Sequence, residues 1–95
     1  MNLGKVVGTV VSTKKEPVLD GIRFLLVRLV DTDGKDTSSF VVAADAMGAG
    51  PGEMVLTAAG SSARQTTLTD KKPVDNVIMA IVDTWEVDGK TKYTK

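Results

Sequence analysis

The 95-residue sequence contains no cysteine and no histidine. Without these side chains it cannot form a Ser-His-Asp triad, a Cys-His pair or a Cys/His zinc site. Enzyme chemistry would have to use lysines, carboxylates or an oxygen-ligand metal site, and because acidic side chains are usually solvated, a small carboxylate-dependent enzyme is only an alternative hypothesis. The candidate carboxylates are Asp45, Glu53, Asp75 and Asp83.

The sequence also lacks an excess of charge and a long apolar run. Lys and Arg total 12, Asp and Glu total 12, and the net charge is zero, so no global attraction to nucleic acid or to an anionic membrane is expected. No apolar run reaches the ~20 residues that span a bilayer. The opening residues, MNLGKVVGTVV, lack the apolar core and cleavage site of a secretory signal. We therefore expect a soluble, cytoplasmic protein without a membrane partner.

Aromatic residues are scarce, at 4% of the chain. Small barrels that bind single-stranded nucleic acid stack bases on aromatic side chains along a basic groove. Phe24 and Phe40 lie in strongly apolar runs, where core packing is the expected role, which leaves Trp85 and Tyr93. A nucleic-acid-binding module is therefore the second alternative, and we expect no nucleic acid partner.

Short segments rich in β-branched residues, separated by Gly, Pro and Asp, are typical of strands joined by turns. Asp88-Gly89 is a pair favoured in two-residue type I′ hairpins. The only segment with helical character is GSSARQTT, in which Ser61 or Ser62 would cap a single turn. Strands are predicted at residues 3–13, 22–31, 39–46, 53–60 and 76–87, with a short sixth strand at 91–93.

This order of elements predicts an all-β fold, a small OB-like antiparallel β-barrel with one short helical turn, in a single domain spanning residues 1–95. Gly4 and Gly8 share one strand face, which indicates a close approach of another backbone or a bend in the sheet. The runs RFLLVRLV and VIMAIV are apolar on both faces. Since a lone small barrel buries one face of each strand, the second face predicts an oligomer or a covering loop.

The glycine-rich stretch DAMGAGPGEMVL, residues 45–56, fits no nucleotide-binding fingerprint. Its glycines have G-x-G-x-G spacing and lead into a predicted strand rather than a helix. The stretch is therefore interpreted as a stiff turn or contact surface, in which Gly50 is expected to need a positive φ or to face a neighbour too close for a Cβ. Gly50→Val would then cost roughly 1–3 kcal/mol.

Five segments in order, LGKVVGTVVSTKKEP, LDGIRFLLVRLVD, AADAMGAGPGEMVL, GSSARQT and KPVDNVIMAIVD, closely resemble the EutN/CcmL family of pentameric shell proteins that occupy the vertices of bacterial microcompartments. The resemblance extends to Asp83, and the combination of GAGxGE, GSSAR and PVDxxIxxIVD is specific. Two features depart from the family pattern. Met47 replaces a small aliphatic residue, and the tail TWEVDGKTKYTK matches no family motif.

The resemblance implies a structural protein, not an enzyme, without a cofactor. It implies a cyclic homopentamer that closes the fivefold corners of a shell in the cytoplasm and contacts hexameric and pseudohexameric shell proteins. Arg64 would form a positive collar around the axis, or would instead pair with a carboxylate or a carbonyl. The implied shell contacts are Gly48, Ala49, Gly50, Gly52 and Glu53, and the residues implied nearest the axis are Ser61, Ser62 and Arg64.

Overall fold

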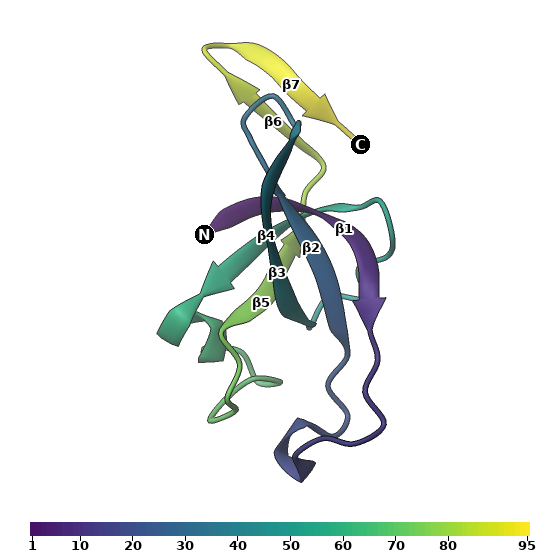
Figure 1. Ribbon diagram of the computed structural model, residues 1–95. Coiled ribbons are helices and arrows are strands. Elements are labelled where there is room, and N and C mark those ends of the chain that lie inside the picture. Colours follow the sequence, from purple (N-terminus) through teal and green to yellow (C-terminus); the bar gives the residue numbers. More distant parts are fainter.

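The computed structural model describes all 95 residues and contains seven strands and two 3-10 segments (Figure 1). The helical content is limited to these two short segments, and no helix has the length and apolar character to cross a membrane. The elements are β1 (Asn2–Val10), η1 (Pro17–Leu19), β2 (Phe24–Val30), β3 (Asp36–Asp45), β4 (Met54–Ala59), η2 (Gly60–Arg64), β5 (Asn76–Ile81), β6 (Thr84–Val87) and β7 (Lys90–Thr94).

Strands β1 to β5 form a closed barrel in the order β1-β2-β3-β5-β4, and β4 pairs again with β1. This confirms the predicted all-β, OB-like barrel. The prediction of a wholly antiparallel sheet is wrong at one position, because β3 and β5 pair in parallel at Ala44–Val77 and Asp45–Ile78. The reason is topological: strand direction cannot alternate all the way around a closed ring of five strands, so one neighbouring pair must be parallel.

Two clusters of buried apolar side chains form the core. Alternation along the strands places the first cluster inside the barrel, where Leu25 and Val27 of β2 are fully buried. The second cluster lies toward the end of the barrel that carries η2, and residues before and after η2 contribute to it. The first cluster comprises Val6, Leu25, Val27, Ala43, Ala49, Val55 and Ile78, and the second comprises Ala44, Ala58, Ala63, Val74 and Val77.

The predicted close approach at the glycines of β1 is confirmed at one of them. A Cβ added at Gly4 would collide with the side chain of Val27 and lie 3.2 Å from the carbonyl oxygen of Arg28. At Gly8 the nearest atom would be the Cβ of Leu26 at 3.9 Å, an ordinary contact, and the strand register shifts between Val6 and Gly8. Gly4 therefore admits the neighbouring strand, whereas Gly8 lies beside a bulge.

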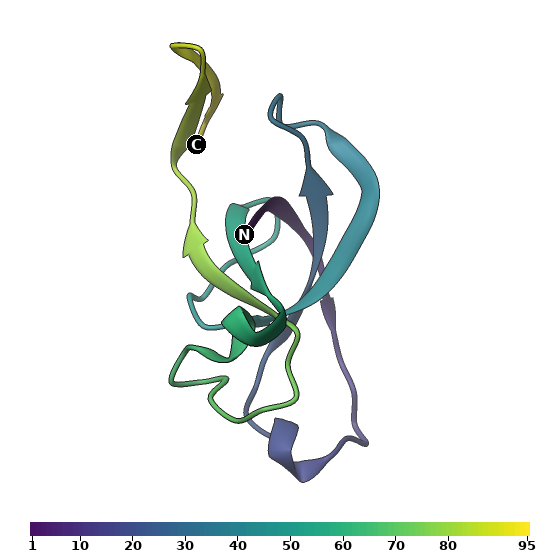
Figure 2. The same ribbon diagram turned by 90° about the vertical axis from the view of Figure 1, so that its left-hand side faces the viewer.

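The predicted strand at residues 76–87 is two strands in the structure. β5 ends at Ile81, and β6 begins a separate two-stranded sheet with β7. The predicted hairpin turn is confirmed, since Asp88 and Gly89 have φ of 52° and 76°, as a type I′ turn requires. Viewed from two sides, this hairpin extends away from the barrel beside the β2–β3 turn (Figures 1 and 2).

A second 3-10 segment, η1, was not predicted. Pro17 opens it with a φ already suited to a helical turn, and the amide of Asp20 closes it by donating to the Pro17 carbonyl oxygen. The expectation that helical character is confined to GSSARQTT is therefore wrong. A segment of only three residues, lying between longer polar turns, is too short to show the apolar periodicity that identifies a helix.

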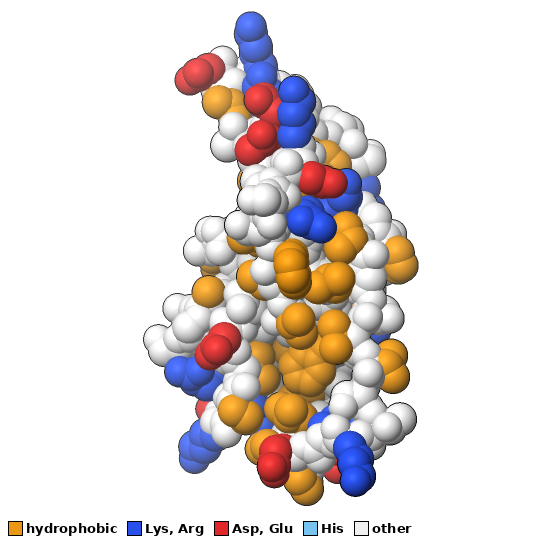
Figure 3. All heavy atoms as spheres, in the orientation of Figure 1, with side chains coloured by type: hydrophobic (Ala, Val, Ile, Leu, Met, Phe, Trp, Pro, Cys, Tyr) orange, Lys and Arg blue, Asp and Glu red, His pale blue; other side chains and the backbone are white.

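The outer face of the β1–β2–β3 sheet is partly apolar. Leu26 of β2 pairs with Val42 of β3, which is 44% exposed, so the prediction of two apolar faces on this strand is confirmed. In the space-filling view, apolar side chains form a column that descends from the middle of the molecule toward its lower end (Figure 3). Phe40 was expected in the core, but it is 57% exposed and packs against the guanidinium of Arg28, 5.7 Å from the ring centroid.

Candidate functional site

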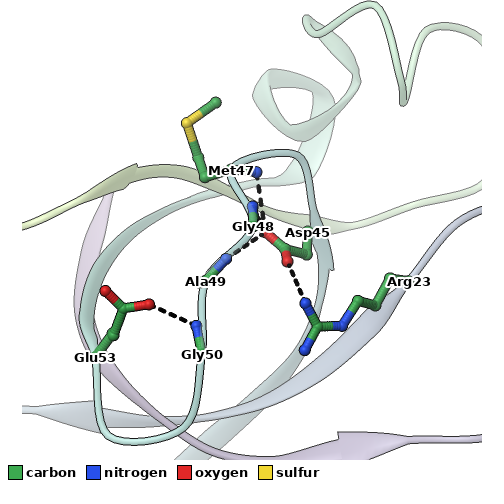
Figure 4. Close-up of polar contacts among 7 residues, drawn as sticks. All are labelled: Arg23, Asp45, Met47, Gly48, Ala49, Gly50 and Glu53. Atoms are coloured by element: carbon green, nitrogen blue, oxygen red, sulfur yellow. Dashed lines mark hydrogen bonds and ion pairs between the residues drawn. The ribbon is translucent and has the colours of Figure 1, made fainter.

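The glycine-rich loop connects β3 to β4 and spans residues 46–53. Its first turn is organised by Asp45, the last residue of β3, whose side chain is only 2% exposed. Oδ1 of Asp45 accepts hydrogen bonds from the amides of Met47, Gly48 and Ala49, at 2.9, 3.0 and 3.3 Å (Figure 4). One carboxylate oxygen thus satisfies three consecutive backbone donors, which defines the path by which the chain leaves the sheet.

The negative charge of Asp45 is balanced by Arg23 through the second carboxylate oxygen. Arg23 donates from Nη1 to Oδ2 at 3.2 Å, and its side chain remains 52% exposed (Figure 4). The backbones also meet, since the amide of Asp45 donates to the carbonyl oxygen of Arg23 at 2.8 Å. A buried carboxylate costs free energy unless it is paired and hydrogen-bonded, and Asp45 satisfies both conditions.

The far end of the loop is held by Glu53. Its Oε1 accepts the amide of Gly50 at 2.6 Å, and its Oε2 accepts the ammonium of Lys95 at 3.1 Å. The Gly50 amide, followed by Lys95, lowers the pKa of Glu53, and Glu53 in turn raises the pKa of Lys95. This carboxylate therefore links the loop to the end of the C-terminal hairpin.

The backbone of the loop corrects the prediction made for Gly50. Gly50 does not have a positive φ, and a Cβ there would lie 3.4 Å from Glu53 Oε1, which is an ordinary contact. Gly48 and Gly52 instead have φ of +74° and +83°. Glycine occupies these conformations without the strain that a Cβ would introduce, so a substitution at either of these two positions would be strained.

The residues of the loop differ in their exposure to solvent. Met47 is 48% exposed, and Gly48 and Gly52 are exposed as well. Ala49 is fully buried in the first core cluster, where it anchors the loop to the barrel. Ala49 therefore presents no side chain to a neighbouring molecule.

The second predicted segment lies on η2, at the opposite end of β4 from the loop. Ser61 and Ser62 are exposed, but neither side chain caps the segment, because the residue before it is Ala59 and no side-chain cap bond forms. The capping prediction is therefore wrong. The turn is stabilised instead by the hydroxyl of Thr69, which donates to the carbonyl oxygen of Ala63 at 2.6 Å.

Arg64 ends η2 and pairs within its own chain. Its Nη1 lies 3.4 Å from the carbonyl oxygen of Val74 and 3.7 Å from Oδ1 of Asp75. This is the intramolecular pairing that the sequence allowed as an alternative to a positive collar. The side chain remains 38% exposed, so a face of the guanidinium is still open to solvent.

The residues on which the alternative functions depended are dispersed. Asp45, Glu53 and Asp75 each have a partner described above, and no three His, Cys, Asp or Glu side chains gather as ligands for a metal ion. Trp85 and Tyr93 stack on each other with ring centroids 4.8 Å apart. These two residues therefore do not form the row of aromatic faces along a basic groove on which bases would stack.

The family model described as "Ethanolamine utilisation protein EutN/carboxysome" matches residues 1–83. The chain belongs to the EutN/CcmL family, and this confirms the predicted family and its structural, non-enzymatic class. The hairpin after residue 83 lies outside the matched range.

Individual members of the family are similar over nearly their whole length. The carboxysome shell vertex protein CcmL of Gloeobacter violaceus is 47% identical over 95 residues, which are 100% of this chain and 95% of that protein. Its solved structure has a TM-score of 0.96 and covers 100% of this chain and 98% of its own. The structure of GrpN, a pentameric microcompartment shell protein from Rhodospirillum rubrum, has a TM-score of 0.84 at 42% identity and covers 92% of this chain and 99% of its own.

Proposed function

We propose that this chain assembles as a homopentamer that forms the vertices of a bacterial microcompartment shell, with residues 1–95 acting as one domain. The observation that carries the proposal is the full-length similarity to a carboxysome shell vertex protein, at 47% identity with a TM-score of 0.96. The pentameric state is supported by the similarity to GrpN.

The function is geometric. A flat layer of hexamers cannot close on itself, and pentamers inserted at fixed points supply the curvature that closes a polyhedron. A head-to-tail interface whose rotation closes after five copies produces such a unit. The partners are other copies of this chain and the hexameric and pseudohexameric shell proteins of the facets, and the location is the shell in the cytoplasm.

Two segments take separate roles in this proposal. The loop containing Gly48, Gly50 and Glu53 contacts the neighbouring shell proteins, and its rigidity favours this because little conformational entropy is lost on contact. Ser61, Ser62 and Arg64 lie nearest the fivefold axis. Repeated around that axis, the exposed face of Arg64 forms a positive collar that attracts small anions.

The experiment compares shells assembled with and without this chain, using its natural hexameric partners. Facets form in both cases, whereas shells lacking this chain have open corners because hexamers alone do not supply the curvature. Electron microscopy detects missing vertices, and leakage of an encapsulated reporter measures closure. If shells lacking this chain and any other pentamer are equally sealed, the vertex role is wrong.

A further inference from the structure

An apolar groove lies at the end of the barrel away from the C-terminal hairpin. Its volume is about 790 Å³, and it lies where the end of β1, the η1 segment and the chain leading into β5 approach one another. Neither the glycine-rich loop nor Ser61, Ser62 or Arg64 contributes to it. Its apolar lining includes Val10, Val11, Leu19, Phe24, Val42 and Val74.

The groove lies beside the second core cluster, whose five members are at most 4% exposed. Val74 belongs to that cluster and lines the groove, and Leu19 and Phe24 pack against the cluster while remaining partly exposed. Within this one chain, apolar surface beside the buried cluster therefore stays exposed in the groove. Covering it would remove further apolar surface from water, which is favourable by ~25 cal/mol per Å².

Exposed valines continue the groove over the outer face of the sheet. Val10 is 41% exposed and pairs with Phe24 across β1 and β2, and Val42 is 44% exposed and pairs with Leu26 across β2 and β3. Val11 follows β1 and is 85% exposed. A contiguous apolar surface of this kind on a small soluble protein indicates an interaction site.

The charged groups around the groove already have partners within the chain. Lys15 donates to the carbonyl oxygen of Ser12 at 3.1 Å, Arg23 pairs with Asp45 at 3.2 Å, and Asp75 lies 3.7 Å from Arg64. A small charged ligand or a nucleic acid phosphate would have to displace these pairs. The groove therefore suits an apolar protein surface.

We propose that a second copy of this chain covers this groove in the pentamer, an inference that rests on the proposed function and names the surface through which the ring closes. A ring with an odd number of copies cannot be built from two-fold contacts. Each copy therefore contributes its groove on one side and a different surface on the other. The pentameric state of GrpN, similar over 92% of this chain, favours a second copy over an unrelated partner.

The test introduces a charge into the groove with Val42→Lys and compares it with Val7→Lys. The pair is matched, because both residues are valines in strands, both are 44% exposed, and only Val42 lines the groove. Light scattering after size exclusion gives the mass, and circular dichroism reports the fold. The expected result is loss of the pentamer in Val42→Lys, with a folded monomer, and a wild-type mass in Val7→Lys.

A second variant, Val11→Asp, covers the case in which Val42→Lys does not fold, since Val11 lies outside the strands and is largely solvated. A pentameric mass for both groove variants would overturn the inference and leave the proposed function standing. The same is true if both remain pentamers but fail to enter shells, because the groove would then bind another shell protein. A monomeric wild-type chain would overturn the proposed pentamer itself.

Discussion

At the scale of single residues, Asp45 organises the start of the glycine-rich loop from the end of β3. It is buried, it accepts three backbone amides, and it pairs with Arg23. Its two oxygens thus connect β2, β3 and the start of the glycine-rich loop. The sequence identified Asp45 only as a carboxylate available for catalysis, because the partners that explain its role become neighbours only after the barrel closes.

Asp45→Ala is therefore expected to destabilise the protein by about 2–4 kcal/mol, because it leaves backbone donors and the Arg23 charge without a partner. Asp45→Asn should cost less, since the amide oxygen still accepts from the loop. Urea unfolding measures both. Asp75→Ala is the control, because the Asp75 side chain is 87% exposed and its pair with Arg64 is worth about 0–1 kcal/mol. Equal effects at positions 45 and 75 would contradict the role of Asp45.

Glu53 makes the stability depend on pH. Its pKa is lowered below the ordinary value of 4.5 by the Gly50 amide and by Lys95, so the folded state favours the ionised form. A lowered folded pKa stabilises the protein fully above the unfolded pKa, and the stabilisation is lost as pH falls through the folded pKa. Wild type should therefore melt at a higher temperature than Glu53→Gln at neutral pH, and the difference should shrink as pH falls below 4.5 and vanish below the lowered pKa of folded Glu53.

Thermal unfolding of both proteins across this pH range provides the measurement. Glu86→Gln is a suitable control, because Glu86 is an exposed glutamate on β6 away from the loop. A difference between wild type and Glu53→Gln that persists unchanged in acid would show that the charge of Glu53 does not act through these bonds.

At the scale of secondary-structure elements, the β6–β7 hairpin depends on its contacts with the barrel. A two-stranded hairpin alone is marginally stable in water. Trp85 stacks on Tyr93 and donates from Nε1 to the carbonyl oxygen of Thr32 at 2.8 Å, while Lys92 pairs with Asp33 at 3.3 Å. The hairpin is thereby attached to the β2–β3 turn, and Lys95 attaches its end to the glycine-rich loop.

Trp85→Ala should release the hairpin and leave the barrel intact. Hydrogen exchange should show the amides of β6 and β7 losing protection by at least about tenfold, which corresponds to ~1.4 kcal/mol of local stability. Amides in the centre of β2 should keep their protection. In Trp85→Phe, which retains an aromatic ring but no donor, the protection of β6 and β7 should lie between that of wild type and that of Trp85→Ala. Equal loss of protection in β2 and β6 would indicate that the hairpin is part of the barrel's cooperative unit.

At the scale of the whole molecule, the two ends have different surfaces. The hairpin end is rich in charged side chains, whereas a column of apolar side chains, flanked by charged groups, extends toward the opposite end (Figure 3). Only 18 of the 95 residues are buried, and the groove beside the second core cluster leaves apolar side chains exposed. A small barrel with so thin a core gains stability when neighbours cover its apolar surface. The pentameric assembly and its groove contact are consistent with this requirement.

Much of the fold could be predicted because it depends on local patterns. The β-branched composition of short segments identified the strands of the barrel, and Asp88-Gly89 identified the hairpin turn. The family resemblance, which rests on motifs spread along the chain, was also recognisable without coordinates. The run at residues 76–87 was predicted as one strand because nothing in its composition marks the point where β5 leaves the barrel.

The sequence by itself determined the strands, the main turns, the family and the residues available for each role. Tertiary structure alone decided the parallel pairing of β3 with β5, the bonds of Asp45 to Arg23 and of Glu53 to Lys95, and the apolar groove beside the second core cluster. The physical reason is distance along the chain. Periodicity and turn preferences act over a few residues, whereas Glu53 and Lys95 are 42 positions apart and meet only when the barrel and hairpin are in place.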